Sequence, residues 1–152
     1  MPPIPAPLAL ARQIAPALHG LSWAIGGSVL LHRLGLEAAP RDLDIVTTDQ
    51  DFAPLCAQLA QHLQRIERTP HPRYISQHFA RFVSPQNVSV DVMASIAVRG
   101  AQGEHTWAFD PATIEQQGGL PWMRAADWLV LYRLFDRPVR VAQLAQYLGS
   151  VA

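Results

Sequence analysis

The first 65 residues alternate between amphipathic segments and short apolar runs, and this order limits the folds open to the chain. The helical spacing of apolar residues predicts helices over 7–19, 28–34 and 49–65. Between them, the apolar run 21–25 and the alternating, β-branched run 42–47 are typical of strands. Strands joined by helices build a sheet that the helices cover. The sequence therefore predicts an α/β (α+β) fold with a mixed β-sheet flanked by helices.

The following part of the chain has a different pattern, in which strands succeed one another directly. Alternation and β-branched residues predict strands over 74–76, 79–83 and 88–94, and short edge pieces over 106–109 and 120–123. The residues Ser-Pro-Gln-Asn at 84–87 favour a hairpin turn between the last two of the longer strands.

Two apolar helices are expected at the C-terminal end, over 125–135 and 139–148. We find no linker and no internal repeat in the sequence. We therefore expect a single domain over 1–152, with its core at about 21–94 and a C-terminal helical part at about 124–149.

Composition narrows the range of functions. The formal net charge is zero, which argues against general affinity for a nucleic-acid backbone. All 12 basic residues are arginine, so no lysine can act as nucleophile or phosphate ligand. The single cysteine, Cys56, excludes an internal disulfide and a cysteine-based zinc site. Since the apolar runs are short and the N-terminus does not resemble a signal peptide, we expect a cytoplasmic protein without a membrane partner.

A glycine-rich turn connects the first expected strand with the second expected helix. Gly26, Gly27 and Ser28 stand where the chain passes from Ile25 into that helix. Glycines let backbone N–H groups approach a ligand closely, and a helix N-terminus favours a phosphate. Such turns also occur without any ligand, so the turn alone leaves both interpretations open.

Two carboxylates follow on the next expected strand. Asp42 and Asp44 are two residues apart, so their side chains share one face, while Leu43 and Ile45 face the core. Adjacent like charges repel, and magnesium is commonly held by carboxylates together with substrate phosphates. A solvated strand end or a salt bridge from Arg41 is the alternative explanation. Arg41 is as well placed to contact a triphosphate as to screen Asp42.

A third carboxylate lies in a later strand. In the stretch 88–93 (Val-Ser-Val-Asp-Val-Met) the valines share one face and Asp91 lies on the other. An acidic residue inside an apolar strand needs a partner or a role. If this strand neighbours 42–47, three carboxylates meet beside the glycine turn, a set suited to metal-assisted phosphoryl or nucleotidyl transfer. A sheet that separates Asp91 from Asp42 would instead indicate a structural domain with salt-bridged aspartates.

The stretch 25–28 (Ile-Gly-Gly-Ser), followed by 42–45 (Asp-Leu-Asp-Ile) and by Asp91, resembles the DNA polymerase beta-like nucleotidyltransferase superfamily. Fourteen residues lie between Gly27 and Asp42, slightly more than that superfamily's usual spacer. The later region looks like the small bacterial branch that includes abortive-infection type toxins. The resemblance covers about 21–93 well and the rest of the chain loosely.

This resemblance implies a nucleotidyltransferase fold and a magnesium-dependent enzyme. Such an enzyme moves a nucleoside monophosphate from a nucleoside triphosphate, such as ATP, to a hydroxyl group of a small molecule, a protein or a tRNA. The resemblance also implies two groups of site residues: nucleotide-binding Gly26, Gly27, Ser28 and Arg41, and catalytic, metal-binding Asp42, Asp44 and Asp91. Two Mg²⁺ ions are expected. Recognition of the acceptor would come from the C-terminal helices, from a second copy of the chain or from a small partner protein.

The C-terminal helices depart from that branch. Tyr132 stands where the branch usually has lysine, and Arg140 and Gln143 stand where it often has aspartates. Arg133 carries a positive charge one position later, on a different helical face. These departures leave the fold prediction unchanged. They favour an alternative function, a catalytically degenerate nucleotidyltransferase-fold module for binding or regulation, such as one half of a toxin–antitoxin pair.

Other conspicuous residues have simpler explanations. His32 is expected to be a half-buried helix residue rather than a phosphate ligand, and Cys56 a small buried apolar residue. The tryptophans, including Trp128, are expected in core and edge packing, with base stacking as the alternative. Three arginines could line a cleft, and the sequence does not select among them: Arg73, Arg81 and Arg99.

Overall fold

The computed structural model describes residues 3–151. Its helices are α1 (Ala6–Ile14), η1 (Ala15–Leu18), α2 (Gly27–Arg33), α3 (Asp49–Leu59), η2 (Pro111–Thr113), α4 (Ala125–Leu134) and α5 (Pro138–Val151). Its strands are β1 (Trp23–Gly26), β2 (Leu43–Thr47), β3 (Gln64–Ile66), β4 (His78–Val83), β5 (Ser89–Ala94), β6 (Ile96–Gly100), β7 (Gly103–Trp107), β8 (Glu115–Gln117) and β9 (Leu120–Trp122).

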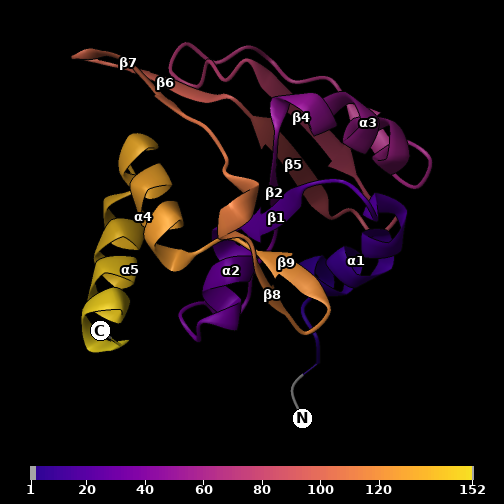
Figure 1. Cartoon of the computed structure of the whole chain (residues 1–152), viewed down its shortest axis with the longest axis horizontal. Coiled ribbons are helices and arrows are strands. Elements are labelled where there is room, and N and C mark those ends of the chain that lie inside the picture. The colour runs from indigo at the N-terminus through magenta and orange to yellow at the C-terminus, as the bar shows by residue number, and fades with distance from the viewer. Residues whose placement is uncertain (1–2, 152) are drawn as a thin grey trace.

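Seven of the strands form one sheet in the order β3-β4-β5-β2-β1-β9-β8, and β6 pairs with β7. β2 runs parallel to β5 and β1 parallel to β9, while the other neighbours in the large sheet are antiparallel. The predicted α/β (α+β) fold with a mixed sheet is therefore confirmed. Figure 1 shows the β6–β7 hairpin extending away from the body of the protein, and α4 and α5 lying together.

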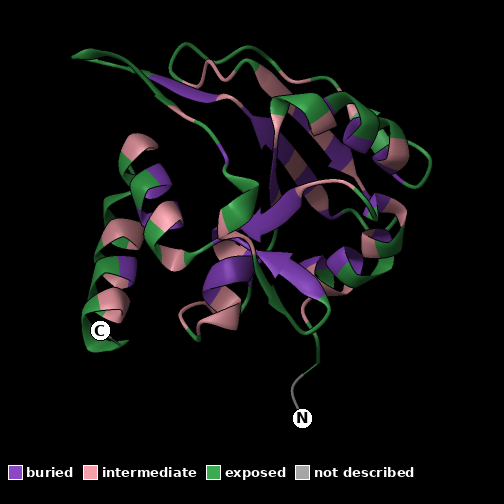
Figure 2. Ribbon diagram, in the orientation of Figure 1, coloured by how far each residue is buried: buried purple, intermediate pink, exposed green. Residues whose placement is uncertain are grey.

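The two faces of the central strands differ in chemistry. Leu43 and Ile45 of β2, and Val90 and Val92 of β5, are fully buried, as their alternation predicts. α3 packs against β4 and β5, and α1 contacts β2. In Figure 2 the central strands are largely buried, whereas α5 exposes much of its length. The intervening residues of β2 and β5 lie on the opposite face of the sheet, which leaves that face free to build a site.

Two helices end earlier than the apolar spacing indicates. The helix predicted over 7–19 stops at Ile14 and continues as η1, since Pro16 has no N–H for a helical hydrogen bond. The helix predicted over 49–65 stops at Leu59, although the N–H of Leu63 still donates to the Leu59 carbonyl at 2.8 Å. Beyond that turn the chain extends and pairs with β4, so sheet pairing prevails over helical spacing.

The strand predictions were confirmed in part. The turn at 84–87 is present: the N–H of Asn87 donates to the Ser84 carbonyl at 2.9 Å, and Asn87 has φ of 65°. The regular strand predicted over 74–76 is wrong, because this segment contacts β6 through an isolated bridge at Tyr74 and a hydrogen bond from the Ile75 N–H to the Ala97 carbonyl at 3.0 Å, without a continuous ladder. β3, β6 and β8 were not predicted. β8 is polar and exposed along its length, so it has no apolar alternation to reveal it.

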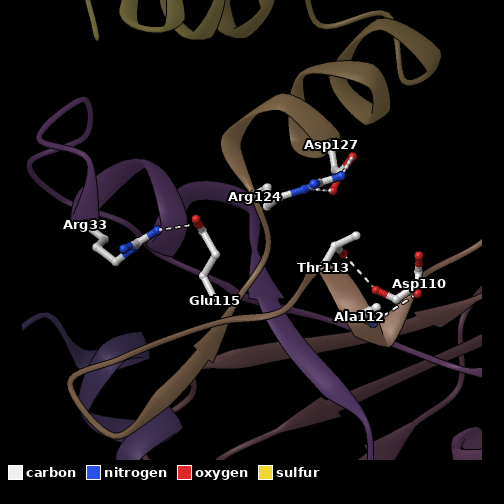
Figure 3. A network of polar contacts seen from close by, with 7 residues as sticks. All are labelled: Arg33, Asp110, Ala112, Thr113, Glu115, Arg124 and Asp127. Carbon is white, nitrogen blue, oxygen red and sulfur yellow. Dashed lines mark hydrogen bonds and ion pairs between the residues drawn. The ribbon is translucent and has the colours of Figure 1, made fainter. Parts of the chain in front are cut away.

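Arginines at the ends of α2 and α4 form ion pairs with nearby carboxylates. On α2, Arg33 donates to Glu115 (Nη2–Oε1 3.3 Å), and its guanidinium lies 5.0 Å from the Trp122 ring centroid. At the start of α4, Arg124 forms an ion pair with Asp127 (Nε–Oδ2 2.9 Å). Figure 3 shows both pairs. Within residues 3–151, no helix is long and apolar enough to cross a membrane.

Candidate active site

A row of charged side chains crosses the middle of the large sheet. In the β2–β5 register Asp44 lies opposite Asp91, and in the β4–β5 register Arg81 lies opposite Asp91. On the other side, Gly26 of β1 lies opposite Asp44. Residues opposite one another in a sheet present their side chains on the same face. The condition posed by the sequence is therefore met, because the strand carrying Asp91 is the direct neighbour of the strand carrying Asp44.

Asp44 is the most perturbed acid of this row. Burial, as the largest cause, and the negative charges of Asp91 and Asp42 together raise the pKa of Asp44 to about 7, while Arg81 and Arg137 oppose this rise. A carboxylate held among other carboxylates and away from water is poorly stabilised as an anion. Perturbation of this kind, caused by burial together with specific charged neighbours, is common at functional sites.

The glycine turn lies directly against this carboxylate. Gly27 has φ of +61°, a conformation that side-chain-bearing residues rarely adopt. A Cβ atom at Gly27 would overlap Oδ2 of Asp44, and one at Gly26 would overlap the ring of Trp128. The absence of a side chain at Gly27 therefore lets the backbone approach the Asp44 carboxylate, and its absence at Gly26 lets the backbone approach α4. The turn brings the N-terminus of α2 beside Asp44.

Within the row, Asp91 forms an ion pair with Arg81. Its two carboxylate oxygens accept hydrogen bonds from Arg81, at 2.7 Å from Nε to Oδ1 and 3.0 Å from Nη2 to Oδ2. The side chain of Asp91 is 19% exposed and that of Arg81 39% exposed. These hydrogen bonds raise the pKa of Arg81, and the charges of Asp91, Asp42 and Asp44 act in the same direction.

The row forms part of the wall of a cavity of about 760 Å³. One wall is the sheet face, a second is the segment 67–76, and a third comes from α4 and the start of α5. Polar and charged residues predominate in the lining: Ser28, Glu37, Arg41, Asp42, Asp44, Glu67, Arg68, Thr69, His71, Ser76, Arg81, Asp91, Arg137 and Arg140. Its volume is in the range of pockets that hold small ligands.

A scan against protein-family models finds no match to this sequence, and neither does a search of curated proteins. Solved structures do match. A protein of Thermotoga maritima assigned as a nucleotidyltransferase (TM1012) gives a TM-score of 0.69 at 18% identity, covering 97% of this chain and 96% of that one. ANT(2″)-Ia in complex with adenylyl-2″-tobramycin gives 0.61 at 13% identity, covering 94% and 90%. Lincomycin-bound LnuA, a lincosamide antibiotic adenylyltransferase, gives 0.53 at 13% identity, covering 92% of each.

The chain has the nucleotidyltransferase fold. The expectation drawn from 25–28, 42–45 and Asp91 is thereby confirmed at the level of the fold. At identities of 18% and below, the likeness says nothing about individual residues, so each site residue rests on its own geometry.

Other candidate residues occupy less defined positions on this nucleotidyltransferase fold. Asp42 precedes β2 and is exposed, while its backbone carbonyl accepts a hydrogen bond from the Ser28 hydroxyl at 3.4 Å. Arg41 is exposed and lines the cavity. In the described part of the chain no ion pair joins Arg41 to Asp42 or Asp44. The salt bridge considered as an alternative explanation for the aspartate pair is therefore not formed.

The carboxylates fit a divalent cation by their chemistry. Carboxylate oxygens are the donors that Mg²⁺ prefers, and a cation beside Asp44 would relieve the repulsion that raises its pKa. Within residues 3–151, however, no three acidic, histidine or cysteine side chains are gathered into a complete metal-binding group. Asp91 is held by Arg81 instead.

The C-terminal helices of the nucleotidyltransferase fold line one side of the cavity. Tyr132 is 8% exposed and borders it, and burial raises the pKa of this phenol. Arg140 reaches across to Glu37 (Nη2–Oε1 3.0 Å) and also bonds Gln143 at 3.1 Å. The hydrogen bond from Arg140 lowers the pKa of Glu37. Positive charge at this wall thus comes from α5 and the residue before it, and Arg133, which is exposed, does not line the cavity.

Sequence reasoning did not single out several cavity residues. Arg81 was only one of three candidates, yet counting outward from the turn at 84–87 places it opposite Asp91, so the hairpin itself carried that signal. Trp128 was expected in packing, and it packs on Gly26 while also lining the cavity.

No sequence pattern pointed to Arg68 and Arg137, because the folding of two distant segments brings them to the cavity. His32 is accounted for locally, since its Nδ1 lies 2.8 Å from the Glu37 carbonyl.

Proposed function

We propose that this protein is a magnesium-dependent nucleotidyltransferase that moves a nucleoside monophosphate from a nucleoside triphosphate to a hydroxyl acceptor. The observation that supports this best is the row in which Asp44 and Asp91 stand on adjacent strands, with the Gly26–Gly27 turn pressed against Asp44. A carboxylate pair beside a helix N-terminus offers adjacent sites for cations and for phosphate groups.

Each residue has a role in this proposal. Gly26, Gly27 and Ser28 bind phosphate oxygens at the N-terminus of α2, with Arg41 as a further contact to the triphosphate. Asp42, Asp44 and Asp91 hold two Mg²⁺ ions. When bound, Mg²⁺ supplies positive charge that neutralises the triphosphate and stabilises the charge developing in the transition state.

The transfer itself is an in-line displacement. The acceptor hydroxyl oxygen forms a bond to the α-phosphorus while the bond from that phosphorus to the pyrophosphate oxygen breaks. The hydroxyl proton passes to a carboxylate oxygen of Asp91, and pyrophosphate carries away the electron pair.

The acceptor class stays open among small molecules, proteins and tRNA. ANT(2″)-Ia and LnuA, which share the fold, are bound to adenylyl-2″-tobramycin and lincomycin in their structures. Such antibiotics are small acceptors, and the cavity has a volume suited to small ligands. In this proposal the wall built by Tyr132, Phe135 and Arg137 contacts the acceptor, alone or with a second protein.

The test is calorimetric titration with ATP and Mg²⁺ of the wild-type protein and of Asp44→Asn. The variant is expected to lose about 100-fold or more in Mg²⁺-dependent ATP affinity, because a proposed ligand of the cation is removed. Glu104→Gln, the same kind of change on the exposed β7 strand, is the matched control and should bind like wild type. Equal Mg²⁺-dependent binding by Asp44→Asn and wild type would refute the proposed site.

A second candidate function is a nucleotidyltransferase-fold module that binds a nucleotide or a partner protein without catalysis, for example in a toxin–antitoxin pair. The ion pair between Arg81 and Asp91 favours it, since the third carboxylate is already neutralised. Pyrophosphate release separates the two functions. Steady release from ATP in the presence of hydroxyl acceptors supports the enzyme, whereas Mg²⁺-dependent binding without release supports the module.

A further inference from the structure

Arg81 has a special position at the proposed site. Among residues 3–151 it is the only side chain that hydrogen-bonds the Asp91 carboxylate, and it engages both oxygens. This two-pronged geometry is the strongest way in which a guanidinium binds a carboxylate, and it suits a phosphate group equally well. Arg81 therefore has two possible partners once a triphosphate enters the cavity.

A second guanidinium lies near Arg81 on the cavity wall. Its Cζ lies 5.7 Å from the ring centroid of Phe79, and the Cζ of Arg68 lies 3.8 Å from the same centroid. Burial and the charge of Arg81 lower the pKa of Arg68. Two guanidiniums share one ring on the cavity wall, so an anionic ligand would relieve the repulsion between them.

A divalent cation at Asp91 would face Arg81 directly. Because both charges are positive and the hydrogen bonds are short, the two cannot share the carboxylate without strong repulsion.

We propose that Arg81 is the resident counter-ion of Asp91, which a divalent cation displaces when a triphosphate offers the guanidinium its phosphate oxygens. This inference rests on the proposed function and adds a residue that controls how the cation and the nucleotide bind to the site. The cation alone binds weakly, the nucleotide alone is held in part by Arg81, and the two together bind cooperatively.

Titration with Mn²⁺ alone, which prefers the same oxygen ligands, tests this directly. Arg81→Gln is expected to bind Mn²⁺ about tenfold more tightly than wild type, within the usual range of coupling between sites. Arg68→Gln removes an equal charge from the same cavity without touching a carboxylate, and should change Mn²⁺ affinity far less. The double variant Arg81→Gln/Asp91→Asn should lose the gain, because the released carboxylate is gone.

A second measurement uses ATP in the presence of EDTA. Arg81→Gln should bind metal-free ATP more weakly than wild type while binding Mn²⁺ more tightly, and these opposite changes cannot result from partial unfolding. Arg81→Lys keeps the charge and loses the second hydrogen bond. Its affinities for metal-free ATP and for Mn²⁺ should therefore lie between those of wild type and Arg81→Gln. Thermal melting of each variant confirms that it is folded.

The outcomes separate the two proposals. If Arg81→Gln binds Mn²⁺ no better than wild type while the wild type still binds ATP in a manner that needs Mg²⁺ and Asp44, the counter-ion role is wrong and the proposed function stands. If neither protein binds Mn²⁺ and Asp44→Asn leaves ATP binding unchanged, both proposals are overturned.

Discussion

Two arginine–carboxylate pairs in this protein have the same local design and different surroundings. Arg81 and Asp91 face each other across β4 and β5, and Arg99 and Glu104 face each other across β6 and β7. Their closest N–O distances are 2.7 Å and 2.9 Å. The first pair lies on the central sheet beside Asp44, whereas both side chains of the second are more than half exposed on the protruding hairpin.

The difference shows that pair geometry alone does not identify a functional site. An exposed cross-strand pair is stabilised weakly, because water and salt screen both charges. The half-buried pair stands beside Asp44, a second half-buried carboxylate whose pKa is about 7. The Arg81 guanidinium offsets the negative charge of that carboxylate, which the fold would otherwise leave poorly solvated. Matched variants in the two places can measure this difference.

The largest effect is expected from removing the acid of each pair. Asp91→Asn should lower Mg²⁺-dependent nucleotide turnover by about 100-fold or more, because it removes the carboxylate that we propose as cation ligand or proton acceptor. Pyrophosphate release measures this. Glu104→Gln should leave turnover within about twofold of wild type, as expected for a surface change away from the site. A similar loss in both variants would mean that the central row has no special role.

Next in size is the effect of adding a methyl group to a glycine near each pair. Gly27→Ala should destabilise the fold by about 3 kcal/mol or more, since the left-handed backbone is strained and the new Cβ overlaps the Asp44 carboxylate. Gly103→Ala also has a positive φ but open space around its Cβ, so about 1–2 kcal/mol is expected. Urea unfolding curves measure both.

Nucleotide binding sharpens this glycine comparison. Gly27→Ala should lose Mg²⁺-dependent ATP affinity even at temperatures where it is folded, whereas Gly103→Ala should keep it. If the two alanine variants lose the same free energy of unfolding, the contact between the turn and Asp44 does not constrain the structure.

A smaller difference is expected between the coupling energies of the two pairs. A double-mutant cycle on Arg81 and Asp91 should give about 1–2 kcal/mol, and one on Arg99 and Glu104 should give below about 1 kcal/mol. The free energy of unfolding without metal or nucleotide is the quantity to measure. A larger coupling on the hairpin would contradict the importance assigned to burial here.

The smallest effect is the response of these couplings to salt. Raising the salt concentration from about 0.05 to 0.5 M shortens the screening length severalfold and should abolish the coupling of Arg99 with Glu104. The coupling of Arg81 with Asp91 should keep most of its value, because the carboxylate is 19% exposed. Equal salt sensitivity would show that solvent screens the central pair as well.

Much of the fold could be predicted because its determinants are local. Alternation in 88–93 was enough to separate the buried valines from Asp91, and the turn at 84–87 was recognised from its residues. β8 escaped prediction since it has no apolar residues, and the helix expected over 49–65 was too long because pairing with β4 extends its last residues. Local patterns do not record competition between a helix and a distant strand.

The candidate site was likewise predicted only where its features depend on local sequence. The sequence placed Asp42, Asp44 and Asp91 as a conditional set, and the β2–β5 register satisfied its condition. The sequence did not predict the close contact of Gly27 with Asp44 or the packing of Trp128 on Gly26. They depend on how helices approach the sheet, which is decided by packing over the whole chain.

By itself the sequence determined which residues share a face, since the pleat of a strand and the turn of a helix are fixed by backbone geometry. It thereby determined that each of the two strands β2 and β5 would carry a carboxylate on one side and apolar core residues on the other. Only the tertiary structure decided which charges meet. Coulomb interactions depend on distance and burial, so the raised pKa of Asp44 and the pairing of Asp91 with Arg81 exist only once the strands and helices are assembled.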